Sequence, residues 1–200
     1  MAVAPDELPL PHRILDAAEG VLRRHGPEKT NVVDIAKVLG MSHGNIYRHF
    51  PNKKALLEAV ASRWLHAVTD PLQAVAENRS LNAAQRLKAW FDTLRAIKQN
   101  KMICDPEMFQ MHYYIVQHSR EVVSDHVAVL QAQVAGIIAE GVANGEFAAH
   151  LKPKAAAQAF FMSTYPFHHP ALLQQHPGPR DEEAAAVFDL LLAGLRAGPA

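Results

Sequence analysis

The chain has little cysteine and no excess of charge of either sign. Its 200 residues include one cysteine, Cys104, and 20 acidic side chains against 20 lysines and arginines. A single cysteine excludes an internal disulfide framework and a zinc site built from several thiolates. Zero net charge argues against a protein that coats nucleic acid without specificity. No apolar run is expected to reach the length of a membrane span, and no secretory signal is expected at the start, so we predict a cytoplasmic protein.

The composition is that of a folded protein with one locally basic segment. Hydrophobic residues make up 49% of the chain and charged residues 20%, which is typical of globular domains. The segment 37–54 holds Lys37, Arg48, Lys53 and Lys54 but no acidic residue. Such a segment on a neutral chain indicates a focused contact with a polyanion, and a solvated face is the alternative.

Apolar residues recur at helical spacing nearly throughout, and alternating runs bounded by hairpin turns are absent, so the chain is predicted to be all-α. Gly26-Pro27, Gly40 and Pro71 are expected to end helices. The segment 166–179, which contains four prolines, is the best candidate for a loop. The expected helices cover 11–24, 32–39, 42–48, 53–70, 72–78, 82–100, 105–117, 120–144, 153–167 and 181–197.

Two of the short helices, 32–39 and 42–48, are joined by a tight turn at Gly40-Met41, which is a helix-turn-helix pattern. A helix as short as 42–48 is unstable alone, so we expect Ile46 and Phe50 to hold it against the core. Its other side would present His43, Gly44, Asn45, Tyr47 and Arg48, which suit a major groove. Glycine at position 44 costs about 1 kcal/mol relative to alanine in a helix. A missing side chain at this position indicates that another backbone or a base edge comes close to it.

Residues 13–60 resemble the DNA-binding domain of the tetracycline-repressor (TetR) family of bacterial transcription regulators. The resemblance implies an N-terminal three-helix, helix-turn-helix DNA-binding domain at 9–54 and a larger helical effector-binding and dimerisation domain at 55–200. The matching positions are Ile14-Leu15-Asp16-Ala17-Ala18, Gly26, Thr30, Asp34-Ile35-Ala36, Gly40, Ser42, Gly44, Tyr47-Arg48-His49-Phe50, Lys53 and Leu56-Leu57.

The resemblance also implies roles for single residues in DNA binding. Tyr47, His49 and Lys53 would hold phosphates, and Thr30 would cap the second helix and touch the DNA backbone. The local pattern by itself allows either Thr30 or Asn31 as this cap. His43 and Asn45 are predicted to reach base edges, and an asparagine contact to adenine discriminates by about 1–3 kcal/mol. The predicted set is Thr30, Ser42, His43, Gly44, Asn45, Tyr47, His49 and Lys53. The alternatives are a core tyrosine at Tyr47 and a solvated helix start at Lys53 and Lys54.

The larger domain is expected to bind a second copy of the chain and a small molecule. By resemblance, 153–167 and 181–197 would form a four-helix bundle between two subunits, and burial within one chain is the alternative. Few charges interrupt the stretch from Met102 to Tyr114, which favours an apolar or aromatic effector. The candidate effector contacts, each of which could be ordinary core, are Trp90, Met102, Phe109, His112, Tyr113, Phe160 and Tyr165.

Other classes of function lack a pattern in the sequence. His112, His118 and His126 do not share one helical face, so neither a metal nor another cofactor is expected. Nucleophile and phosphate-loop motifs are missing, and a Glu107/His112 pair has nothing to single it out, so no enzyme is expected. We predict a homodimeric repressor that an effector releases from a palindromic operator. The alternative is a helical small-molecule-binding or interaction module without a specific DNA target.

Overall fold

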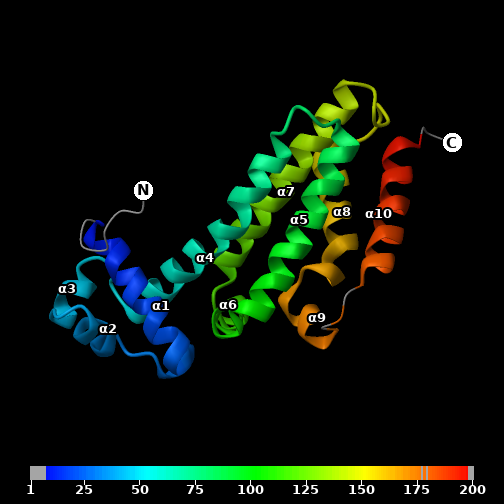
Figure 1. The fold of residues 1–200 in the computed structure, drawn as a ribbon. Helices are drawn as coiled ribbons and strands as arrows, with labels where there is room; N and C mark the ends of the chain where they lie inside the picture. Colours follow the sequence, from blue (N-terminus) through cyan, green and yellow to red (C-terminus); the bar gives the residue numbers. More distant parts are fainter. Residues whose placement is uncertain (1–7, 177, 179, 198–200) are drawn as a thin grey trace. The chain divides into compact units, whose positions relative to one another are not determined.

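The chain folds into helices joined by short connections (Figure 1). This computed structural model describes residues 8–176, 178 and 180–197, without the side chains of residues 112 and 115–117. Every regular element in these described residues is a helix, so the all-α prediction is confirmed. The elements are α1 (Leu10–Lys29), α2 (Val32–Val38), α3 (His43–Tyr47), α4 (Lys53–Ala76), α5 (Ala83–Cys104), α6 (Pro106–His118), α7 (Arg120–Ala143), α8 (Pro153–Thr164), η2 (Tyr165–Phe167), α9 (Pro170–Gln175) and α10 (Asp181–Arg196).

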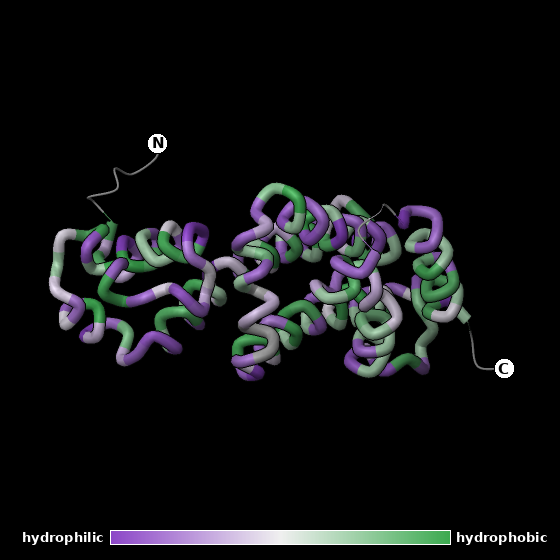
Figure 2. Tube along the Cα trace, turned by 90° about the horizontal axis from the view of Figure 1, so that it is seen from below, coloured by the Kyte–Doolittle hydropathy of each residue, from purple (hydrophilic) through white to green (hydrophobic). Residues whose placement is uncertain are grey.

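The helices form two compact units. The first unit contains the chain up to Leu65 together with Cys104–Val123, and the second contains His66–Ile103 together with the chain from Ser124 onward. In both, hydrophobic and hydrophilic residues alternate along the helical turns (Figure 2), as expected when one face of each helix is buried. The predicted boundary after residue 54 separates a DNA-binding segment from an effector-binding segment and does not coincide with the limits of these two packing units. It stays a prediction.

The first unit is built around α1, which packs against α2 and α6. Ile14 and Ile35 are completely buried in its core. Ion pairs fasten the helices at the edge of this core. Arg63 of α4 pairs with Glu19 of α1, and Arg23 of α1 pairs with Asp105 through a nitrogen–oxygen distance of 2.9 Å.

The second unit has an aromatic core. Phe91 packs its ring against those of Phe160, Phe167 and Phe188, with ring centroids 6.0–6.3 Å apart. The indole N–H of Trp90 donates to the side-chain oxygen of Gln133 at 2.9 Å, and the amide of Gln133 donates to a carbonyl of α4 at 3.1 Å. This chain of bonds links α5, α7 and α4 and satisfies polar groups that would be costly to bury alone.

The predicted stop after α7 is present and links α7 to α5. Gly145 has a φ of +76°, a left-handed conformation that glycine adopts without strain. The carboxylate of Glu146 accepts the backbone N–H groups of Ala83 and Ala84, at 3.1 and 3.3 Å, and so caps α5. The ring of Phe147 lies against Gly141, where a Cβ atom would overlap it.

One predicted helix end is confirmed and one is wrong. Gly26, with φ +74° and ψ 168°, is not helical and ends the first helical run of α1, and a separate short turn follows from Pro27 to Lys29. Pro71 lies inside α4, which continues to Ala76, so 72–78 is no separate helix. Proline removes one backbone donor, and the buried side chains of Val68 and Leu72 favour continuation on both sides of it.

The predicted loop at 166–179 is also wrong over the part that is described. It contains most of η2 and all of α9, while residues 177 and 179 lie outside the described residues. Pro166 and Pro170 occupy the first turns of these helices, where a missing N–H costs little. The prolines therefore begin short helices here instead of preventing them.

The expectation that no apolar run reaches the length of a membrane span is wrong for α7. This helix has 24 residues and a mean hydropathy of 1.5, so by length and composition it is the one described helix that could cross a membrane. Its buried face includes His126 and Gln133 beside Leu130 and Val134. Those residues pack into the second unit, and core helices pass the same test of length and composition.

Candidate nucleic-acid interface

A short turn with defined hydrogen bonds sets α3 against α2. The side chain of Asn31 accepts the N–H of Val33 at 3.1 Å and caps α2. Of the two caps that the sequence allowed, Asn31 is therefore the one present, and the capping role that the resemblance implied for Thr30 is wrong. Gly40 takes a φ of +63°, and the N–H of Met41 bonds back to Ala36 at 3.0 Å. The chain then enters α3 only a few residues after α2 ends.

One buried side chain anchors α3. Ile46 has no exposed surface, whereas Phe50 is half-buried, so the core role predicted for Phe50 is met only in part. The remaining side chains of the segment are available to a partner. Asn45 is half-buried, and the exposed residues are Ser42, His43, Gly44, Tyr47, Arg48 and His49.

Tyr47 lies on the surface of this helix. Its exposed fraction is 42%, so the alternative of a core tyrosine is wrong. Its ring meets that of His43 edge to face, with centroids 6.1 Å apart. A hydroxyl and an imidazole therefore lie side by side on the exposed face, and both can donate to oxygen atoms of DNA.

Gly44 has no intramolecular reason to be glycine. Its φ is not positive, and a Cβ atom built there would meet only Ser42 Oγ, at 3.8 Å. That distance is an ordinary contact, so alanine would fit the isolated chain and favour the helix. The missing side chain leaves room for something outside the chain.

Two residues of the predicted DNA-binding set already have partners near the end of α1. Thr30 is 2% exposed, and its hydroxyl donates to the carbonyl of Gly26 at 2.6 Å. The ammonium of Lys53 donates to the carbonyl of Glu28 at 3.0 Å. A lysine has three donors and can bind a phosphate as well, whereas the Thr30 hydroxyl would have to leave its bond.

The predicted effector contacts divide between the two units. Trp90 and Phe160 lie in the core of the second unit, and half-buried Tyr165 packs against it, where burial raises the pKa of the Tyr165 phenol. Met102, at the end of α5, is half-buried. Buried Phe109 and half-buried Tyr113 belong to the first unit, and the side chain of His112 lies outside the described residues.

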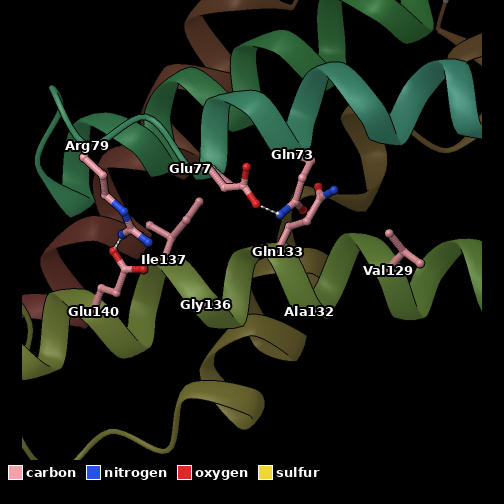
Figure 3. A pocket seen from close by; sticks show the side chains of 10 residues that line it. Gln73, Glu77, Arg79, Val129, Ala132, Gln133, Gly136, Ile137 and Glu140 are labelled. Carbon is pink, nitrogen blue, oxygen red and sulfur yellow. Dashed lines mark hydrogen bonds and ion pairs between the residues drawn. The ribbon is translucent and has the colours of Figure 1, made fainter.

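A surface groove of about 380 Å³ lies between α4 and α7 in the second unit (Figure 3). Gln73 of α4 and Glu77, which directly follows this helix, share a hydrogen bond at the edge of the groove, and Arg79 forms an ion pair with Glu140. The rest of the groove is lined by Ala76 of α4 and by Val129, Ala132, Gln133, Gly136 and Ile137 of α7. None of the predicted effector contacts whose side chains are described lines this groove.

Sequence reasoning missed a group of buried basic residues in the second unit. Lys98, His126 and His168 are 3%, 9% and 4% exposed. Burial lowers the pKa of Lys98 to about 7, that of His126 to about 2 and that of His168 to about 3, because it penalises the charged forms. These residues lie on α5, on α7 and beside η2, and no spacing along the chain predicts their proximity.

The two helices predicted to bind a second subunit, α8 and α10, pack against each other. Phe160 and Phe188 on one side of this pair belong to the core. On the other side, Met162 is 58% exposed and Leu190 is 75% exposed. Burial within one chain therefore accounts for only part of their apolar surface.

Comparison with known proteins supports both halves of this description. Residues 14–60 match the family described as bacterial regulatory proteins, tetR family, and residues 83–188 match the tetracyclin repressor-like, C-terminal domain. The fatty acid metabolism regulator protein of Bacillus subtilis is 24% identical over 152 residues, which are 74% of this chain and 76% of that protein.

Two further comparisons separate local from overall similarity. The transcriptional regulator TtgR of Pseudomonas putida is 36% identical over 66 residues, 33% of this chain and 31% of that protein. The crystal structure of the regulator FadR from Bacillus subtilis in complex with stearoyl-CoA is 20% identical, with a TM-score of 0.64, and the match covers 90% of this chain and 97% of that one. The similarity to the FadR structure shows that the two chains have the same fold.

Proposed function

The chain belongs to the TetR family of bacterial regulatory proteins, and on this basis we propose that it is a homodimeric repressor that inserts α3 of each subunit into a major groove of its operator. The observation that carries the proposal is the exposed face of α3. Gly44 is glycine without an intramolecular cause, and Tyr47 is 42% exposed. A short helix with a gap and an exposed hydroxyl suits close contact with DNA.

Within this surface we assign two kinds of contact. Tyr47, His49 and Lys53 bind phosphates, which position the protein without reading sequence. His43 and Asn45 reach base edges, where sequence is read. Ser42 and Gly44 lie at the start of α3, and their small size allows the helix to approach the DNA closely. Thr30 contributes to the backbone contact only if its hydroxyl exchanges the carbonyl of Gly26 for a phosphate oxygen.

The second subunit would pack on the exposed side of α8 and α10. Met162 and Leu190 supply apolar surface there, and contact with the same helices of a second copy would bury it in a four-helix bundle. A two-fold axis places two copies of α3 about 34–36 Å apart, one helical turn of DNA, or a multiple of that distance. A palindromic operator in the cytoplasm is the corresponding target.

A small, largely apolar or aromatic effector would release the DNA. The aromatic core of the second unit supports this chemistry, and the B. subtilis FadR structure, which has the same fold, contains stearoyl-CoA. Release requires that the effector bind more tightly to a subunit arrangement whose α3 spacing no longer fits the operator. The ratio of the effector's affinities for the released and the DNA-bound arrangements sets how much the effector weakens operator binding.

Fluorescence anisotropy with labelled duplex from upstream of the protein's own gene tests the proposal. We expect binding that prefers this duplex over random DNA and weakens steeply with salt. Tyr47→Phe removes only the exposed hydroxyl, so it should weaken binding to both duplexes and leave the fold intact. If genomic fragment selection also returned no preferred site, the repressor proposal would be wrong and a sensing module without a DNA target would replace it.

A further inference from the structure

Lys98 of α5 and four histidines of the second unit form a group of basic side chains that act on one another. We call them the basic cluster: Lys98, His66, His126, His168 and His169. Lys98, His126 and His168 are buried, His169 is half-buried and His66 is exposed. The charge of Lys98 acts on His126, His168 and His169, and that of His66 acts on His126. The cluster therefore draws on α4, α5, α7 and the residues that follow α8.

Positive charges shift the pKa values within the basic cluster. Lys98 lowers the pKa values of His126, His168 and His169, and Lys101 lowers that of Lys98. Desolvation also lowers the pKa of each of these four groups. An anion placed among them would be attracted by several groups at once and would raise those pKa values.

Polar atoms of two histidines in the cluster lack partners among the described residues. Both ring nitrogens of His126 and Nδ1 of His169 are buried without a hydrogen bond. His168 does have one, because its Nε2 lies 3.3 Å from the hydroxyl of Thr164. Buried polar atoms are nearly always satisfied in folded proteins. A ligand oxygen is the kind of group that would satisfy these ring nitrogens.

A metal ion does not fit this arrangement. The described residues contain no group of three or more histidine, cysteine, aspartate or glutamate side chains placed to hold one. A protonated Lys98 would repel a cation as well. Aromatic rings instead adjoin the cluster: the ring centroid of Phe161 is 4.7 Å from that of His168, and the centroid of Tyr165 is 4.3 Å from that of His169.

We propose that the basic cluster binds the carboxylate of the effector, with Lys98 and His126 donating to its oxygens and its apolar body lying against the aromatic residues. This inference rests on the proposed function and narrows it: the effector is an amphiphilic organic anion rather than a neutral apolar compound. A charged group at one end then gives orientation and selectivity.

Calorimetric titration of the full-length protein with decanoate, 1-decanol and acetate tests the inference. Each titration is run in two buffers of different ionisation enthalpy, which gives the number of protons taken up. At about pH 7.5, Lys98 with a pKa of about 7 is mostly neutral, so carboxylate binding should take up about half a proton or more. Decanol should bind without proton uptake, and acetate should bind far more weakly than decanoate.

Lys98→Met keeps the length of the side chain and removes its charge. We expect it to weaken decanoate binding at least about tenfold and to abolish the proton uptake, while decanol affinity changes less than about twofold. Lys152→Met, at an exposed lysine of the same unit, is the matched control and should change neither. If Lys98→Met does not fold, as judged by circular dichroism, His126→Leu serves in its place, with the same expected direction.

The outcomes separate this inference from the proposed function, because DNA binding is measured independently by anisotropy. Equal affinity for decanoate and decanol without proton uptake would overturn the carboxylate site and leave the repressor intact. Acetate binding as tightly as decanoate would show a site for small anions and would also overturn it. Failure of all three probes in a protein that still binds its operator would overturn the inference, whereas loss of operator binding alone would overturn the proposed function.

Discussion

Acid should destabilise the second unit through two buried histidines. His126 and His168 have pKa values of about 2 and about 3 in the folded chain, whereas an unfolded histidine titrates near about 6.5. As the pH falls below about 6.5, the unfolded chain takes up two protons that the folded chain refuses, so stability is lost with falling pH. Between about pH 6 and pH 4.5 the loss is about 4 kcal/mol for the pair, a large share of a typical folding free energy.

The measurement is the urea-induced unfolding of the protein across this interval, followed by circular dichroism at fixed protein concentration because a dimer's stability depends on concentration. Lys98 contributes little to the slope, since it is protonated in both states below about pH 6. His126→Leu should remove about half of the slope. His150→Leu, at an exposed histidine of the same unit, should leave it unchanged.

A free energy of unfolding that stays flat from pH 6 to 4.5 would refute this reasoning, because it would mean that the folded chain protonates these rings as readily as the unfolded chain does. An unchanged slope in His126→Leu would refute the assignment to His126 in particular. Both results are read from the same data set.

Three further predictions concern side chains whose surroundings are known. Gly44→Ala should leave stability unchanged or raise it by up to about 1 kcal/mol, yet weaken operator binding measured by anisotropy. Gly141→Ala should lower the free energy of unfolding in urea by about 1–3 kcal/mol, because the new Cβ would lie 2.9 Å from the Cβ of Ala83. Gly136→Ala is the control, because a Cβ at that position meets no atom within 4 Å, and it should not destabilise the protein. Leu190→Asp should produce monomers in analytical ultracentrifugation, and Ile103→Asp, at an equally exposed position of α5, should remain dimeric.

The sequence predicted those features of the fold that depend on local chemistry. The short α3, the turn at Gly40 and the stop at Gly145 follow from glycine and helical periodicity, and the structure contains all three. Pro71 misled the prediction because a proline inside a helix costs about 3 kcal/mol, and the burial of Val68 and Leu72 outweighs such a local penalty. Tertiary packing decides such cases, and a single sequence does not display it.

The candidate sites divide in the same way. The exposed residues of α3 could be predicted because they lie within a few positions of one another and match a family pattern. The basic cluster could not, because Lys98, His126 and His168 come from separate elements and no sequence spacing connects them. The partners of Thr30 and Lys53 were missed for the same reason, since the carbonyls that accept their hydrogen bonds depend on the kink at Gly26.

The most direct test of the central claim, that α3 reads the operator, compares two alanine variants on preferred and random duplex. Asn45→Ala should weaken binding to the preferred duplex by about 1–3 kcal/mol with little change on random DNA. Lys53→Ala should weaken both and reduce the salt slope by about 1. If Asn45→Ala lowered the two affinities equally, or if neither variant changed them, α3 would not be the element that reads the DNA.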